Sequence, residues 1–146
     1  MTYTLLLTLH LVAAVIFIGT VVFEVLILEG IRRHLPKDMM RTVEIAIGDR
    51  ARTIMPWVLL VLFLAGIAMA WNYYRVLLAA PLNSSLGFML WIKIILAVSV
   101  LGHFITAMTL RRRGLLHSRH FRFIHRSVLT HMVVIVLLAK WMFFLA

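Results

Sequence analysis

The sequence predicts an all-α integral membrane protein, a bundle of four transmembrane helices. Of its 146 residues, 64% are hydrophobic, and the mean hydropathy is +1.04. Soluble domains contain roughly 45–50% apolar residues, so a soluble fold of this length could not bury such a composition. Four stretches approach or exceed the roughly 18 predominantly apolar residues that mark a spanning helix. They cover about 5–28, 56–76, 87–110 and 124–146.

Backbone amides in hydrocarbon must be hydrogen-bonded within their own segment, so these runs are expected to be helices despite their Val and Ile content. Gly30 and Pro36 follow the first run, and a Pro, Asn and Ser turn at 81–85 separates the second from the third. Apolar residues alternate with charges over 38–52, which predicts a short interfacial helix leading into the second span. The length favours a single transmembrane domain over 1–146.

The basic residues are concentrated in two connections. The 15 Lys and Arg residues outnumber the 5 Asp and Glu residues, giving a formal charge of +10. Two clusters lie between apolar runs: Arg32, Arg33, Lys37, Arg41, Arg50 and Arg52, then Arg111, Arg112, Arg113, Arg119, Arg122 and Arg126. This placement predicts membrane lipid as the partner, and not nucleic acid. The positive-inside rule then places both clusters in the cytoplasm and both termini outside, in a bacterial-type inner (plasma) membrane.

Several kinds of chemistry are excluded by the residues that are missing. The chain has no Cys, so any metal site must depend on His, Met or carboxylates. The sequence also lacks a Walker loop, a serine triad and an HExxH motif.

Ionisable residues at membrane depth are the main functional candidates, because a charge at the bilayer centre costs at least about 2.5–3.5 kcal/mol. These residues are His10, Glu24, Lys93, His103, His131 and Lys140. At about 1.5 Å per residue, His103 and His131 lie about 24 and 22 Å below the outer surface. Two imidazoles at one level could bind a haem b iron from opposite sides, and b-type haem needs no Cys. Alternatively, the histidines are polar glue between helices, bonded to Ser99, Thr106 or Thr130.

His10, Lys93 and Lys140 lie nearer the outer surface, at about 8–9 Å. The two lysines either extend to the headgroups or pair with an anion such as a haem propionate or an acidic substrate. His10 and Glu24 lie within about 40° of one helical face. That face also includes Ala14, Phe17 and Val21, so it is either a packing seam or the start of a proton path.

The order of these features resembles a superfamily of small four-helix membrane proteins, which includes the HemJ-type protoporphyrinogen IX oxidases and the copper-resistance protein D-like proteins. The first helix, LHLVAAVIFIGTVVFE, is similar in its His, aromatic, Gly and polar positions: His10, Phe17, Gly19 and Glu24. RTIMPWVLLVLFLAGIAMAW looks like the family's second helix, with Arg52, Pro56 and Gly66. WIKIILAVSVLGHF resembles the third, with Trp91, Lys93 and His103, and FRFIHRSVLTHMVVIVLLAK the start of the fourth.

The resemblance implies a haem b site in which His10 and Lys93 serve the oxidation of protoporphyrinogen IX, with Arg52 also near the cofactor. The chain departs from the family at His125 and Arg126, where the enzymes have an Asn-Glu pair, and the spacing from Lys93 to His103 is one residue short. His131 has no counterpart. Because His10 is expected about 14–16 Å above His103, only one pairing can serve a single iron. Geometry favours His103 with His131, and the resemblance favours His10.

The sequence therefore predicts a haem b-binding membrane oxidoreductase that passes electrons between a porphyrin or quinone-like donor and the respiratory chain. One alternative is a copper-handling protein without enzymatic activity, in which His10 and exposed methionines accept copper from the outer side. Another is an assembly factor whose histidines only join helices. A four-helix unit has little surface to enclose a macrocycle, so a homodimer is also considered.

Overall fold

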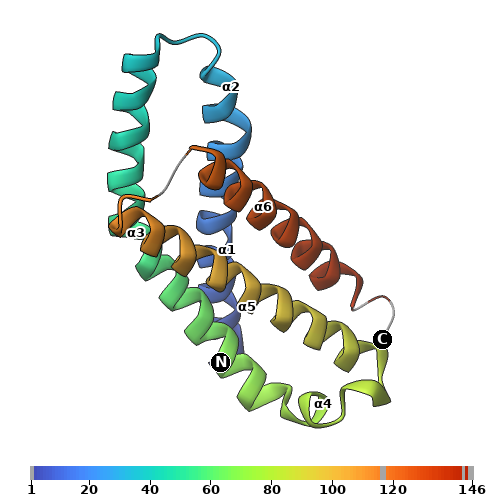
Figure 1. Cartoon of the computed structure of the whole chain (residues 1–146). Helices are drawn as coiled ribbons and strands as arrows, with labels where there is room; N and C mark the ends of the chain where they lie inside the picture. The colour runs from blue at the N-terminus through green and yellow to red at the C-terminus, as the bar shows by residue number, and fades with distance from the viewer. Residues whose placement is uncertain (1, 116–117, 143, 145–146) are drawn as a thin grey trace. The chain divides into compact units, whose positions relative to one another are not determined.

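A computed structural model of the chain describes residues 2–115, 118–142 and 144, without the side chains of 118, 119 and 121. Within these residues all regular secondary structure is helical, and four helices are long and apolar enough to cross a membrane (Figure 1). The prediction of an all-α chain with four candidate spans is confirmed. The chain divides into two units, Met1–Asn72 and Tyr73–Ala146. Each unit has two long helices, which is compatible with a helical bundle.

The first unit begins with one continuous helical span, Thr2–Ile31. It consists of α1 (Thr2–Val22), a π-helical segment η1 (Phe23–Leu28) and the short α2 (Glu29–Ile31). A π-helical turn is formed when a helix accommodates an extra residue, and such turns often occur at functional sites. Glu24 lies within this segment.

One face of α1 packs inside the first unit. Ala13, Phe17 and Val21 are buried, and His10 is half-buried at the outer end of the same face. The opposite face carries apolar side chains that remain open, with Val15 69% exposed. Apolar groups left uncovered along a whole helical face suit a hydrocarbon solvent better than water.

The second long helix, α3 (Lys37–Tyr73), runs without interruption through the segment where a separate interfacial helix was expected. The charged stretch 38–52 is therefore the first part of the spanning helix. Pro56 lies inside α3, where it lacks the N–H that would bond to the Arg52 carbonyl. Contacts between residues 10 and 62 at one end and 32 and 44 at the other show that α1 and α3 are antiparallel.

The second unit starts with α4 (Arg75–Ala79) and a 3-10 turn, η2 (Pro81–Asn83), which occupy the predicted second connection. Next come α5 (Ser85–Arg112) and α6 (Ser118–Trp141), packed against each other (Figure 1). The Ser84 side chain caps α5 by accepting from the Gly87 N–H at 3.0 Å. The Trp91 indole N–H donates to the Leu78 carbonyl at 3.1 Å, which fixes α4 against α5.

The α5 helix ends in a glycine motif that turns the chain back. Gly114 has a φ of +69°, a conformation that favours glycine. The Gly114 N–H donates to the Arg111 carbonyl at 3.0 Å and the Leu115 N–H to the Leu110 carbonyl at 2.9 Å. This is the Schellman arrangement of a helix C-terminus. At the far end of α6, residues 143, 145 and 146 of the predicted fourth span lie outside the described residues.

Candidate functional site

The three histidines of the spans share one hydrogen-bonding feature. Each Nδ1 lies close to a backbone carbonyl oxygen: His10 to Leu62 at 2.9 Å, His103 to Ser99 at 2.7 Å and His131 to Ser127 at 2.8 Å. A carbonyl oxygen only accepts, so Nδ1 must carry the proton and donate it. Nε2 is therefore the basic nitrogen of each ring. Metal-ligating histidines are commonly fixed in this way, by donating their other ring N–H to a carbonyl.

His10 is positioned by α3. Its ring lies against Gly66, where an added Cβ would be only 3.2 Å from Cε1 and 3.3 Å from Nδ1 of His10. Such contacts are tight enough that the imidazole would have to move. Because Gly66 has no side chain, the His10 ring can lie directly against the backbone of α3. The Leu62 carbonyl, one turn away, orients the ring.

The structure brings His103 and His131 together, as their common predicted level requires. Their ring centroids are 5.4 Å apart, with the planes tilted by 56°. The two rings are bonded reciprocally across the helix pair. The Ser127 hydroxyl donates to Nε2 of His103 at 3.1 Å, and the Ser99 hydroxyl donates to Nε2 of His131 at 3.1 Å. All four side chains are half-buried. These bonds across the pair also show that α5 and α6 are antiparallel.

The distance between the His103 and His131 rings limits which ligand the two imidazoles can bind together. Two imidazoles on opposite axial sides of one iron, each bound at about 2.0 Å, would have centroids about 6.3 Å apart. From the observed 5.4 Å, the rings would have to separate by about 1 Å. Both serine bonds would also have to break to admit the macrocycle. Haem ligation by this pair stays a prediction, and it requires that rearrangement.

The other predicted site residues are held near their own helices. Arg52 is exposed, pairs with Asp49 one turn away, and donates from Nε to the Gly48 carbonyl at 3.2 Å. Lys93 is half-buried on α5. Lys140 is exposed near the end of α6, with its ammonium 5.1 Å from the centre of the Phe144 ring. His10 and Arg52 belong to the first unit, and Lys93 and Lys140 to the second.

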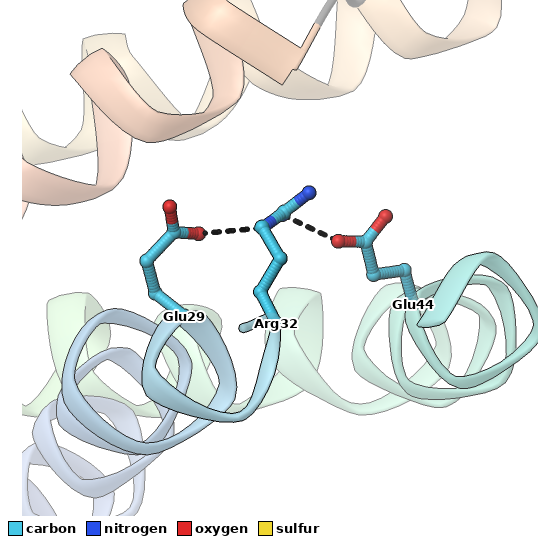
Figure 2. Close-up of polar contacts among 3 residues, drawn as sticks. All are labelled: Glu29, Arg32 and Glu44. Carbon is cyan, nitrogen blue, oxygen red and sulfur yellow. Dashed lines mark hydrogen bonds and ion pairs between the residues drawn. The ribbon is translucent and has the colours of Figure 1, made fainter. Parts of the chain in front are cut away.

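A charged cluster lies where the chain turns from α2 into α3. The sequence did not predict it. Arg32 contacts Glu29 through Nε at 3.1 Å and also pairs with Glu44 on α3 (Figure 2). All three side chains are about one-third exposed. The spacing of Glu29 and Arg32 was a readable signal, because residues three apart are neighbours on a helix. The partner on α3 depends on how the hairpin folds, which the sequence does not specify.

Sequence reasoning also missed Ser127. A short repetition could have revealed it, since the chain reads SVLGH at 99–103 and SVLTH at 127–131. Both segments place a Ser one helical turn before a His. In antiparallel helices such segments can pair reciprocally, each Ser with the other His.

Among the described residues, no group of three or more His, Asp or Glu side chains is arranged to hold a metal ion. Comparisons with protein families, curated proteins and solved structures find no match to this chain.

Proposed function

We propose that the chain is an integral membrane oxidoreductase that binds haem b through Nε2 of His10. The observation that carries this proposal is the bond from His10 Nδ1 to the Leu62 carbonyl at 2.9 Å. It supports an imidazole that donates from Nδ1, so that Nε2 would be the nitrogen that holds the haem iron. The tight approach to Gly66 holds the ring in that orientation. The chemistry of the donor therefore fits a b-type haem.

Haem b would supply one-electron chemistry at a potential set by its axial ligand and surroundings. The protein's own residues would bind the haem and orient it. His10 would provide the ligand, the Leu62 carbonyl would fix its tautomer, and the apolar faces of α1 and α3 would exclude water. By resemblance, Lys93 would pair with a propionate or with an acidic porphyrin substrate.

We also propose the orientation and the membrane. The arginine clusters of the first and third connections face the cytoplasm, and both termini face outward, according to the positive-inside rule. The chain would lie in a bacterial-type inner membrane, where a lipophilic porphyrin or quinone-like donor can reach it from the bilayer. A homodimer would provide the additional surface that encloses a macrocycle.

The absorption spectrum of the purified chain tests the proposal. Protein supplemented with haem should be red and show a sharp reduced-minus-oxidised α-band. His10→Gln should lose this band, whereas His34→Gln, at an exposed loop position, should retain it. Colourless wild-type protein, or an unchanged spectrum in His10→Gln, would overturn the proposal.

Substrate oxidation provides a second measurement. In the haem-loaded protein, with an added electron acceptor in place of the respiratory chain, Lys93→Met should slow oxidation of protoporphyrinogen IX by about 10-fold or more, because a lost charged hydrogen bond costs about 1.5–3 kcal/mol. The α-band should persist, since Lys93 is not proposed as an iron ligand. Oxidation at the wild-type rate would remove Lys93 from the substrate site.

A further inference from the structure

The excess of positive charge in this chain is concentrated in the second unit. The first unit contains six Lys and Arg residues and five Asp and Glu residues, whereas the second contains nine and none. Three of the five carboxylates pair with arginines of their own unit: Glu29 and Glu44 with Arg32, and Asp49 with Arg52. The arginines of the second unit have no Asp or Glu of their own unit to neutralise them.

We propose that the phosphate of one anionic phospholipid binds between Arg122 and Arg126, at the start of the candidate span Arg122–Trp141. Arg126 is exposed and Arg122 is half-buried. Residues four apart are neighbours on a helix, and like charges at this spacing repel each other. A phosphate that accepts from both guanidinium groups replaces this repulsion with charge-assisted hydrogen bonds. The site lies in the second unit, so it goes beyond the proposed haem site at His10 in the first.

The contact between α5 and α6 sets the level of Arg126. Ser127 bonds to His103, so Arg126, one residue away on α6, lies near the level of His103 on α5. The predominantly apolar run of α5 continues beyond His103 to Leu110, about 10 Å further along the helix axis. The backbone of Arg126 is therefore expected inside the apolar layer, where a charge without a partner is costly.

The side chains of Arg122 and Arg126 extend toward the same headgroup layer. Side chains on an α-helix lean toward its N-terminus, and a long Arg side chain can carry its charge further toward the membrane surface. The N-terminus of α6 follows the arginines at 111–113, where α5 ends. From Arg126 this direction leads to Arg122, one turn nearer the connection. The acyl chains of a phospholipid hold its phosphate in that layer, which favours a lipid over a soluble phosphate.

The charge of the second unit also selects the kind of lipid. Phosphatidylcholine carries a cation beside its phosphate, and nearby arginines repel that cation. Phosphatidylglycerol has the same phosphate without the cation. Because residues 73–146 contain no Asp or Glu, nothing of that kind in the unit offsets the repulsion of choline. An anionic lipid is therefore favoured over a zwitterionic one.

Native mass spectrometry of the full-length chain in detergent tests the site, with phosphatidylglycerol and phosphatidylcholine added in equal amounts. The wild type should retain phosphatidylglycerol in preference to phosphatidylcholine. Arg122→Gln with Arg126→Gln should weaken binding of phosphatidylglycerol by about 10-fold or more, because charge-assisted hydrogen bonds are lost. Arg33→Gln with Arg41→Gln is the matched control. It removes the same charge from exposed positions of the first unit, and it should retain the lipid as the wild type does.

Thermal unfolding of the wild type keeps the test independent of whether a variant folds. Phosphatidylglycerol should raise its melting temperature more than phosphatidylcholine does, because a ligand of the folded state stabilises that state. Glycerol phosphate and a short oligonucleotide, each at the concentration of the lipid, should not displace phosphatidylglycerol.

Three results would overturn the proposal. They are equal retention or equal stabilisation by the two lipids in the wild type, an equal loss of lipid in the two double variants, and displacement of the lipid by either soluble anion. None of these outcomes depends on the haem spectrum, so the two proposals fail separately.

Discussion

A histidine surrounded by hydrocarbon needs a partner for each ring nitrogen, because an unpaired polar group there costs several kcal/mol. His103 and His131 meet this need with one carbonyl and one hydroxyl each. The carbonyl belongs to the same helix and the hydroxyl to the facing helix. Each ring therefore fixes its own tautomer locally and joins α5 to α6 at the same time.

Removing one hydroxyl should weaken this junction. We expect Ser127→Ala to lower the free energy of unfolding by about 1 kcal/mol, since it leaves Nε2 of His103 without its donor. Thermal unfolding in detergent measures the effect. Thr130→Ala is the matched control, because Thr130 is exposed and bonds only within its own helix, and it should change stability by less than about 0.5 kcal/mol. Equal effects of the two variants would show that the interhelical bond contributes no stability.

Gly66 allows a sharper test of the His10 position. Gly66→Ala places a methyl group 3.2 Å from the imidazole, and the overpacking should cost about 1 kcal/mol or more. Gly19→Ala is the control, since nothing lies within 4 Å of its added Cβ, and a helical Ala is favoured over Gly by up to about 1 kcal/mol. Denaturation in detergent should thus rank Gly66→Ala below the wild type and Gly19→Ala at or above it. The reverse order would contradict the described contact.

At the scale of elements, the π-helical segment η1 sets the rotation of the two ends of the first span relative to each other. An extra residue in one turn lets α1 bury Phe17 and Val21 while the later residues direct Arg32 at Glu44. An α-helix advances about 100° per residue, so an uncompensated residue would rotate one end away from its contacts.

A pair of deletions tests this. Removing Leu26, an exposed residue of η1, should convert the segment to regular α-helix while preserving the facing of both ends. Removing Val15, equally apolar and exposed but within α1, should rotate His10 by about 100° relative to Phe17. In detergent, we expect the Leu26 deletion to have a melting temperature near that of the wild type. The Val15 deletion should have a lower melting temperature. A more stable Val15 deletion would argue against a compensating turn.

The sequence predicted the features that depend on one segment alone, and it missed those that depend on how two helices face each other. Hydropathy is a property of each segment alone, so it predicted four spans correctly. Counting residues along the helices also predicted that His103 and His131 lie at one level, and the structure brings their rings together. Neither hydropathy nor counting could give the rotation of a helix about its axis, which is why Ser127 and the Arg32–Glu44 pair were missed. The separate interfacial helix was wrong because a charged amphipathic segment and the start of a longer helix have the same local pattern.

For the whole molecule, the absence of cysteine makes the proposed orientation directly measurable. Single cysteines introduced into this background carry no competing thiol. Leu82→Cys, at a position that is 84% exposed in the connection before α5, should react with a membrane-impermeant maleimide in intact cells. Lys37→Cys, also exposed, should react only after the membrane is opened. The opposite pattern would invert the proposed topology.

The length of α3 has a mechanical consequence. Its 37 residues extend about 55 Å, against a hydrocarbon thickness of about 30 Å, so we expect roughly 25 Å of unbroken helix to project beyond the apolar layer. The projecting part is the charged one, from Lys37 onward, and Pro56 lies near its base. The Arg32–Glu44 pair ties this part of α3 to the end of the first span, so we expect the two helices to extend beyond the bilayer together.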